Sequence, residues 1–253
     1  MEGPSKFETT PPKTTPPRIE PAARQERSSP SDALDPPPGV RLPRQPRSRI
    51  SFERMITAAH DLIAESGLEG ATVQGILKRS GVGSGTFYAR FDGRDALLAY
   101  LAIRFWAKAE EGWATVLSPA RWAAAGPKEI VTQFTRMAVV WTRAHGSLLR
   151  AFLVHAMTHE AYDLLDQTAE LDNTVADHLT RLLLPRAEEF IHEDPEQAIR
   201  LATLQVFATL RSRFIFAWGD RPDGIEDQQL AGELASIFLR YLGSAQRARA
   251  ASN

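Results

Sequence analysis

Hydrophobic residues recur at helical spacing over most of the chain after about residue 50. Residues three and four apart share one face of a helix, and no stretch alternates as a half-buried strand does. The first stripe begins near Ser51, ends at Gly67 and carries Phe52, Met55, Ile56, Ala59, Leu62 and Ile63. Later stripes cover roughly residues 95–117, 128–144, 147–159, 161–184, 195–218 and 226–242. The pattern predicts an all-α protein, with a helical bundle in its longer C-terminal part.

The stretch after the first stripe is short, interrupted and rich in small residues. Thr72 is suited to cap a helix that ends at Gly81, because glycine readily takes the left-handed conformation that follows a helix C-terminus. Val82 can fill the angle between two helices, and Ser84 is expected to cap the next helix, which would run to about Phe91. Two short helices joined by a three-residue turn predict a helix-turn-helix that places its second helix in the DNA major groove.

Small and hydroxyl-bearing side chains alternate with aromatic ones in that second helix. Gly85 removes a side chain where the backbone would approach DNA, and Thr86 and Tyr88 offer hydroxyls to phosphates or base edges. Phe87 and Phe91 are expected to point into the domain core instead. The sequence therefore separates a face that would contact DNA from a face that anchors the helix.

Charge and proline are unevenly distributed along the 253 residues. Twelve of the 17 prolines precede residue 47, so residues 1–46 are predicted to be a disordered arm that buries little apolar surface. The formal net charge is −1, but residues 41–100 hold nine Lys and Arg against six Asp and Glu. Positive charge thus gathers around the predicted turn, where a nucleic acid would lie.

The arm ends in a basic segment that adjoins the first helix. Arg47 and Arg49 are its last two cations, and they are predicted to contact DNA along the phosphates or in a minor groove, as homeodomain arms do. A solvated linker is the other interpretation of this segment. The sequence does not choose between the two.

The order of small, aromatic and hydroxyl residues over about 45 to 50 positions resembles the DNA-binding domain of TetR-type transcriptional regulators. The resemblance implies a helix-turn-helix domain at 47–94, an effector-binding and dimerisation domain at 95–245, and a disordered tail at 246–253. It is carried by Ile56, Ala58, Ala59, Leu62, Gly67, Thr72, Val73, Ile76, Gly81, Val82, Gly85, Thr86, Phe87, Tyr88, Phe91, Leu97 and Leu98.

The same resemblance implies a function and a set of DNA contacts. Such regulators typically bind a palindromic double-stranded operator as homodimers, commonly as repressors, and a small effector changes their affinity for DNA. The contacts implied are Thr72, Ser84, Gly85, Thr86, Tyr88, Ala89 and Arg94. Capping alone is the other interpretation of Thr72 and Ser84. The sequence departs from the family pattern at Leu77, Ser80, Gly83, Arg90 and Arg94.

All five tryptophans and many other large apolar side chains lie after residue 95. Tryptophan is bulky and often lines cavities for apolar ligands, so a mostly apolar effector pocket is predicted between helices. The residues expected to line it are Trp106, Trp113, Phe134, Met137, Trp141, Phe152, His155, Phe207 and Phe214. An ordinary bundle core is the alternative for each aromatic residue among them.

Few features favour chemistry other than binding. His155 and His159 share one helical face, but two ligands do not make a site, so no metal is expected. The chain lacks cysteine, a phosphate-binding loop and a nucleophile elbow, so neither enzymatic activity nor a cofactor is expected. Without a signal-peptide pattern or eighteen consecutive apolar residues, a cytoplasmic protein with no membrane association is predicted.

Two long helices near the C-terminus are expected to form the dimer interface. The stripes at 195–218 and 226–242 would pair with their copies across a two-fold axis, and a palindromic operator requires the same symmetry. The alternative function is a ligand-independent architectural module that recruits a partner through its arm. A small molecule that releases DNA would distinguish the two.

Overall fold

The structure is a computed structural model that describes residues 35–158, 162–215 and 224–243. Its helices are α1 (Pro46–Gly70), α2 (Val73–Ser80), α3 (Ser84–Tyr88), α4 (Arg94–Val116), α5 (Pro127–Thr158), α6 (Tyr162–Leu183), α7 (Pro195–Phe214) and α8 (Asp227–Tyr241), with 3₁₀ helices η2 (Pro119–Trp122) and η3 (Leu184–Glu189). Within the described ranges there is one isolated β-bridge and no strand. The predicted all-α fold is confirmed.

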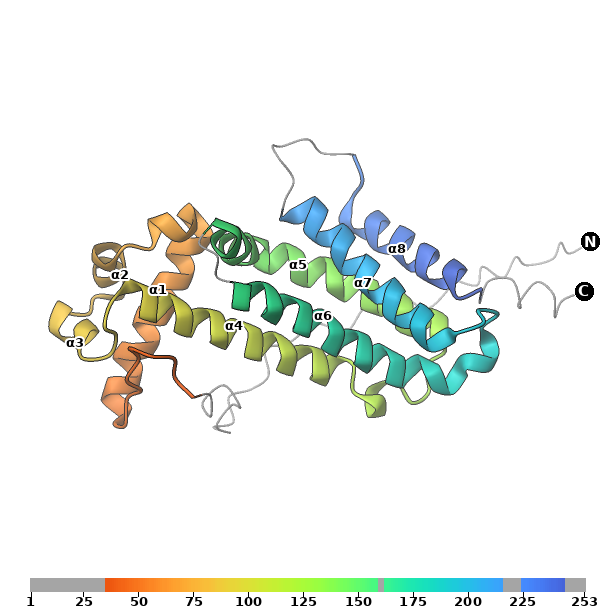
Figure 1. Cartoon of the computed structure of the whole chain (residues 1–253), viewed down its shortest axis with the longest axis horizontal. Coiled ribbons are helices and arrows are strands. Elements are labelled where there is room, and N and C mark those ends of the chain that lie inside the picture. Colours follow the sequence, from red (N-terminus) through yellow and green to blue (C-terminus); the bar gives the residue numbers. More distant parts are fainter. Residues whose placement is uncertain (1–34, 159–161, 216–223, 244–253) are drawn as a thin grey trace, which may run out of the picture.

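Two parts follow one another along the longest axis of the molecule. Figure 1 shows α1, α2 and α3 gathered at one end and α5 to α8 forming the bundle, with α4 running from the first part into the second. No helix in the described ranges is long and apolar enough to cross a membrane. The predicted arrangement of a helix-turn-helix domain followed by a helical bundle is therefore present.

The N-terminal domain is built on aromatic rings from three helices and the turn after α3. Phe52 of α1 stacks on Phe91 with ring centroids 5.0 Å apart, and Phe87 of α3 lies 5.5 Å from Phe91. Tyr100 of α4 meets Phe52 edge-on at 5.3 Å. Phe87 and Phe91 are fully buried, as the sequence predicts, so they fix the position of α3 against the rest of the domain.

Helix α1 differs from its predicted extent at both ends. It begins at Pro46 rather than near Ser51, because proline suits the first turn of a helix, where its missing N–H costs no hydrogen bond. Gly67 interrupts the helical backbone with φ 69° and ψ −176°, as the predicted stop requires, but the chain resumes a helical turn that ends at Gly70.

The predicted arm is wrong for its last residues. Residues 39–45, which we call the strap, are held to the domain: Val40 is buried and forms an antiparallel bridge with Phe91. Backbone hydrogen bonds join the strap to the turn after α3, and they satisfy polar groups that a disordered arm would expose to water. Residues 1–34 and the predicted tail 246–253 lie outside the described residues.

Helix α5 is longer than the sequence predicts. The pattern suggested a break at Gly146, but α5 runs unbroken over 32 residues. Gly146 is buried, and a Cβ added there would lie 3.7 Å from the carbonyl oxygen of Phe214, at the end of α7. Tertiary packing thus outweighs the cost of about 1 kcal/mol that glycine brings to a helix interior.

The buried residues form two hydrophobic clusters. The larger lies among α4 to α8, and the smaller belongs to the N-terminal domain but also includes Leu148, Ala151 and Phe152 of α5. Phe105 of α4 packs against both clusters. Helix α5 therefore connects the bundle directly to the core of the helix-turn-helix domain.

Candidate nucleic-acid interface

The first helix of the turn has the caps that its sequence predicts. Thr72 precedes α2, and its hydroxyl oxygen accepts a hydrogen bond from the backbone N–H of Gly75 at 3.1 Å. Gly81 ends α2 with φ 64°, where a Cβ would also lie 2.8 Å from a guanidinium nitrogen of Arg54. Val82 is buried directly after it, so conformation and packing together set the angle between α2 and α3.

The second helix begins and ends differently from the prediction. The residue that caps α3 is Gly83, whose position has no side-chain hydrogen bond, so the expected capping role of Ser84 is wrong. Ser84 is the first residue of α3 and its side chain is exposed. Helix α3 ends at Tyr88 rather than near Phe91, and Ala89 follows as its C-terminal cap.

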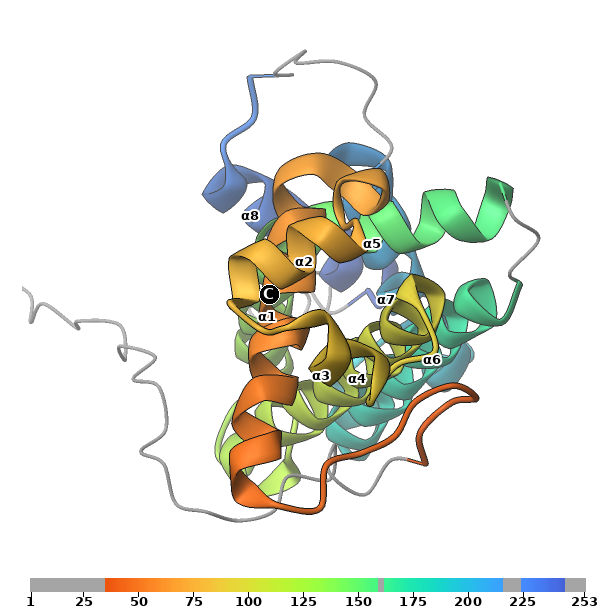
Figure 2. The ribbon, with the colours of Figure 1, turned by 90° about the vertical axis from the view of Figure 1, so that its left-hand side faces the viewer.

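The residues expected to contact DNA on α3 share an exposed surface. Ser84, Gly85, Thr86, Tyr88 and Ala89 are all exposed, and 55% of Tyr88 is accessible to solvent. In Figure 2, in which this end of the molecule faces the viewer, α3 lies in front of α4. A short helix that buries Phe87 and exposes its hydroxyl-bearing side chains can enter a groove while it stays anchored in the domain core.

Other cations and polar groups flank α3. Arg47 and Arg49 are exposed in the first turn of α1, and Thr72 is exposed at the start of α2. Gln74 and Lys78, which are not among the predicted contacts, are also exposed on α2. Helical periodicity could have predicted their exposure. Both are polar and lie three and seven residues after the break at Ala71, on a helix that packs its apolar face inward.

Arg79, the other cation of α2, is committed to α1. Its guanidinium pairs with Glu65 through two hydrogen bonds of 2.7 Å each. The hydrogen bonds from Arg79 lower the pKa of the Glu65 carboxyl below its ordinary value. These two hydrogen bonds join α1 to α2, whereas Lys78 is also exposed at the end of α2.

Arg94, the first residue of α4, donates hydrogen bonds to backbone carbonyl groups at the end of α1. Its Nε donates to the carbonyl oxygen of Ala71 at 3.0 Å, and a second guanidinium nitrogen donates to that of Leu68. These carbonyls end the last turn of α1, where helices leave acceptors without intrahelical partners. Arg94 therefore has a structural role that the sequence did not indicate.

The residues predicted to line an effector pocket are not gathered in one place. Trp113, Phe134 and Phe207 are buried against one another in the bundle, with ring centroids 5.9 to 6.0 Å apart. Trp106 is also buried in the bundle cluster, and Met137, Trp141 and Phe214 are partly buried at its edge. Phe152 belongs to the cluster of the N-terminal domain.

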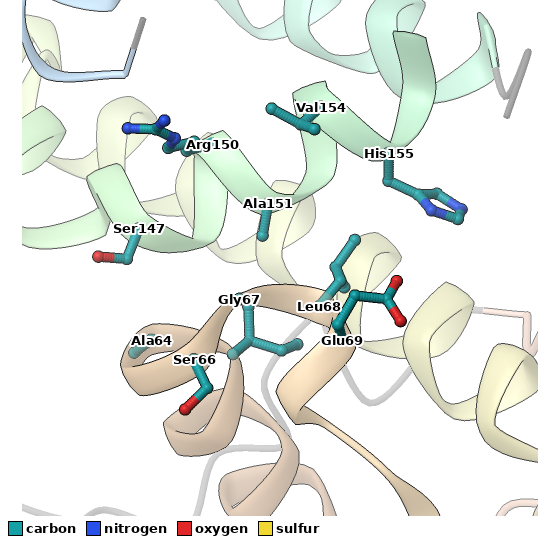
Figure 3. Close-up of a pocket in the computed structure, with 11 residues that line it drawn as sticks. Ala64, Ser66, Gly67, Leu68, Glu69, Ser147, Arg150, Ala151, Val154 and His155 are labelled. Carbon is teal, nitrogen blue, oxygen red and sulfur yellow. The ribbon is translucent and has the colours of Figure 1, made fainter. Parts of the chain in front are cut away.

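His155 lies in a cleft between the N-terminal domain and the bundle. Figure 3 shows Ser66, Gly67 and Glu69 of α1 on one side of this cleft of about 390 Å³, and Ser147 and His155 of α5 on the other. A neighbouring cleft of about 300 Å³ is lined by α1, α4 and α5, and it includes Trp141. The predicted pocket residues thus divide between a packed core and the junction of the two parts.

Four buried polar atoms in the described part of the bundle have no hydrogen-bond partner. They are Nε1 of Trp106 and Trp113 on α4, and Oε1 of Gln167 and Oγ1 of Thr180 on α6. Helices α4 and α6 pack against one another. Buried polar groups are normally paired, so these four atoms are exceptions within the core of the bundle.

The spaced pair His155 and His159 was the one candidate for metal binding in the sequence. Among the described residues, no three His, Asp or Glu side chains lie close enough together to hold a metal ion. His159, the second histidine of the spaced pair, lies outside the described residues.

The chain resembles known regulators in its N-terminal domain and in its overall fold. Residues 55–101 match the family described as bacterial regulatory proteins, tetR family. Over 61 residues the chain is 34% identical to the HTH-type transcriptional regulator YvdT of Bacillus subtilis, a match that covers 24% of this chain and 30% of that protein.

Solved structures extend the likeness in fold to the bundle. A TetR-family transcriptional regulator from Mesorhizobium loti superposes with a TM-score of 0.61 at 17% identity, covering 78% of this chain and 98% of that one. GusR of Salmonella enterica gives a TM-score of 0.53 at 17% identity, covering 80% and 98%. The sequence match is confined to the N-terminal part, and the similarity to solved structures extends the shared fold over about four fifths of the chain.

Proposed function

Because residues 55–101 match the tetR family of bacterial regulatory proteins, we propose that the chain is a regulator of this type and regulates transcription by placing α3 in the major groove of a DNA operator. Members of this family are DNA-binding transcription factors and not enzymes. The single observation that carries the proposal is the exposed surface of α3, where Thr86 and Tyr88 present hydroxyls while Phe87 anchors the helix.

The contacts divide into two kinds. Ser84 and Thr86, on the first turn of α3, would meet base edges and determine sequence preference. Tyr88, Thr72 and the exposed Arg47 would meet phosphates and position the helix without reading sequence. Changing a residue of the first kind alters which DNA is preferred, whereas changing one of the second weakens binding to every sequence.

DNA fragments selected by the purified chain from a random pool provide the test. Thr86→Ala is expected to change the ranking of selected sequences, while Tyr88→Phe lowers affinity for matched and scrambled DNA by the same factor. Thr132→Ala in α5 is the matched control, because it removes the same hydroxyl from the bundle. Wild-type affinity and wild-type preference in both α3 variants would contradict the proposal.

A homodimer is the proposed binding unit. Helices α7 and α8 expose Leu201 (42%), Ile237 (56%) and Tyr241 (41%), large apolar groups that a second copy of the chain would cover. Two copies related by a two-fold axis would place their α3 helices in successive major grooves, about 34 Å apart, and would require a palindromic operator. Sedimentation of the wild-type chain and of Ile237→Glu tests this: the variant is expected to be monomeric.

The proposed effector is a small molecule with an apolar body and an oxygen acceptor. Trp106 and Trp113 lie seven residues apart on one face of α4, and both indole N–H groups lack acceptors. An effector that accepts a hydrogen bond from one of these N–H groups would stabilise the conformation to which it binds. If that conformation binds DNA less tightly, the effector lowers the affinity for DNA.

A thermal-shift screen of small aromatic acids and phenols, each beside its parent hydrocarbon, tests the effector. Compounds with an acceptor are expected to raise the melting temperature of the wild type and to release DNA. Trp106→Phe and Trp113→Phe, which keep an aromatic side chain but lose the indole N–H, should weaken that response. If no compound acts and DNA binding is intact, the ligand-independent module is favoured instead.

Repression is the proposed sign of regulation, because a bound dimer would exclude polymerase from an overlapping promoter. A reporter gene placed behind the selected operator is expected to rise in expression when the gene for this chain is deleted. A fall in expression would indicate an activator.

A further inference from the structure

The strap, residues 39–45, is bound to the end of the recognition helix by its backbone. The N–H of Arg41 donates to the carbonyl oxygen of Arg90 at 2.8 Å, and the N–H of Asp92 donates to that of Gly39 at 2.9 Å. Val40, between them, is buried at 8% exposure. Two hydrogen bonds and a buried apolar side chain fix this segment beside α3, and Figure 2 shows it running past α3 to the start of α1.

Gly39 is suited to this docking by its conformation and its lack of a side chain. Its φ is +81°, and an added Cβ would lie 3.1 Å from the Cβ of Ala96 and 3.2 Å from a carboxylate oxygen of Asp92. A larger residue would therefore meet both strain and close contact. Glycine at this position therefore allows the strap to lie close to Asp92 and Ala96.

Three arginines meet where the strap joins α1 and the turn after α3. Arg41, Arg44 and Arg90 line an open surface pocket of about 710 Å³, together with Leu42, Pro43, Gln45 and Ser48. Asp92 is the carboxylate nearest to this group, and it pairs with Arg41 at 2.6 Å. That ion pair occupies Arg41, so Arg44 and Arg90 supply the positive charge that faces a ligand.

We propose that the strap extends the DNA-binding surface, with Arg44 and Arg90 binding phosphates of the DNA backbone beside the groove that α3 enters. This inference rests on the proposed function, since it requires DNA on α3. Arg41 is a positioning residue: it holds the strap through Asp92 and lies with a guanidinium nitrogen 3.5 Å from the carbonyl oxygen of Tyr88.

The geometry favours a DNA backbone over a free anion. Arg90 follows the exposed Tyr88 by two residues, so the pocket adjoins the surface that is proposed to meet DNA. The pocket is open along the surface, which suits a continuous chain of phosphates. A guanidinium group can bind a phosphate through two parallel hydrogen bonds. Because the group is planar and rigid, its N–H donors are already arranged for this contact at an exposed site.

A salt titration of DNA binding measures the number of phosphates involved. Each phosphate contact contributes about 0.9 to the slope of log affinity against log salt concentration on B-form DNA. The full-length chain, Arg44→Ala, Arg90→Ala and the double variant would be titrated in KCl on selected and on scrambled DNA. Arg136→Ala, an exposed arginine of α5, is the matched control.

The double variant is expected to bind both DNAs more weakly by about the same factor, with a slope smaller by roughly 2 for each bound protomer. Gly39→Val, which leaves every arginine in place, should reproduce part of the loss by detaching the strap. Circular dichroism melts of each variant confirm that the domain is folded at the temperature of the titration.

An unchanged slope in the double variant, with Thr86→Ala still altering sequence preference, would overturn the inference and leave the proposed function standing. Failure of Thr86 and Tyr88 variants to affect binding at all would instead overturn the proposed function. Equal inhibition of DNA binding by inorganic phosphate in the wild type and the double variant, at constant ionic strength, would also count against a phosphate site in the strap.

Discussion

In the N-terminal domain, Phe52, Phe87, Phe91 and Tyr100 hold three helices around one small core and leave the adjoining residues exposed. In the bundle, Trp113, Phe134, Phe207 and Phe238 come from four helices and fill the middle of a larger core. The buried rings of the first set hold neighbouring residues at the surface: Phe87 is buried, and the adjoining Tyr88 is exposed. The rings of the second set are buried on all sides, so they contribute mainly to the stability of the bundle.

The comparison shows how aromatic residues acquire different roles through their surroundings. A buried ring in a five-residue helix determines where its exposed neighbours point, because the helix has no other anchor. A buried ring in a 23-residue helix shares that work with many contacts. Replacing a buried aromatic residue with alanine should therefore lower DNA affinity more in the N-terminal domain than in the bundle.

The largest effect is expected from Phe91→Ala. Removing a fully buried phenyl group destabilises a domain by about 3–5 kcal/mol, and here it also removes the ring that packs against α1 and α3. DNA binding should be lost while far-UV circular dichroism shows that the bundle is still helical. Phe207→Ala is the counterpart in the bundle, with a comparable loss of stability and a smaller loss of DNA affinity.

Gel shifts and denaturant melts of both variants check this. If Phe91→Ala unfolds the bundle in the same transition, the two cores form one cooperative unit through Phe105 and Phe152. Wild-type DNA affinity in Phe91→Ala would contradict the anchoring role of the ring.

A smaller effect is expected in the bundle from Arg211→Ala. Asp172 of α6 is buried, and Arg211 of α7 lies 2.7 Å from its carboxylate. Burial raises the pKa of Asp172 above its ordinary value, against the opposing attraction of Arg211. Losing Arg211 leaves the buried carboxylate unpaired, which should lower the free energy of unfolding by about 2–3 kcal/mol at neutral pH. This loss is smaller than for a fully buried ion pair, because solvent reaches part of Arg211.

The pH dependence of that loss has a definite sign. A raised carboxyl pKa means that its contribution to stability is present below the pKa of the unfolded chain and is lost as pH rises through the folded value. The deficit of Arg211→Ala should therefore shrink as pH is lowered and Asp172 becomes protonated. Asp172→Asn in the Arg211→Ala background should restore stability at neutral pH, and an equal deficit at acid pH would contradict the assignment.

The smallest effect is expected from Arg94→Lys, which separates a structural role from a DNA contact. Lysine keeps the charge but lacks the fork that reaches the carbonyls of Leu68 and Ala71. The variant should lose about 1–2 kcal/mol in thermal stability, since hydrogen bonds from a charged group are involved, and should keep its DNA affinity while folded. Full stability with weakened DNA binding would assign Arg94 to the phosphate backbone instead.

The helix-turn-helix was largely predictable because its signals are local. A cap at Thr72, a left-handed glycine at Gly81 and a plug at Val82 each follow from backbone geometry within a few residues. The shift of the α3 cap from Ser84 to Gly83 is the exception, because the start of a short helix depends on how its neighbours seat it.

The strap and the aromatic residues of the bundle could not be predicted in the same way. A proline-rich segment has no periodic signal, and Val40 acquires a partner only when Phe91, far along the chain, is placed beside it. Tryptophan has the same character in a packed core as in a ligand cavity. Only the contacts distinguish the tight cluster at Trp113 from the junction cleft that includes Trp141.

The sequence by itself determined the all-helical class, the position of the turn and which residues of α3 are buried, because periodicity, caps and glycine conformations act over three or four residues. Tertiary structure alone decided that residues 39–45 join the DNA-binding domain, that Arg94 bonds to α1 and that α5 packs on both cores. These outcomes depend on pairs of groups dozens of residues apart, and the folded chain creates their proximity.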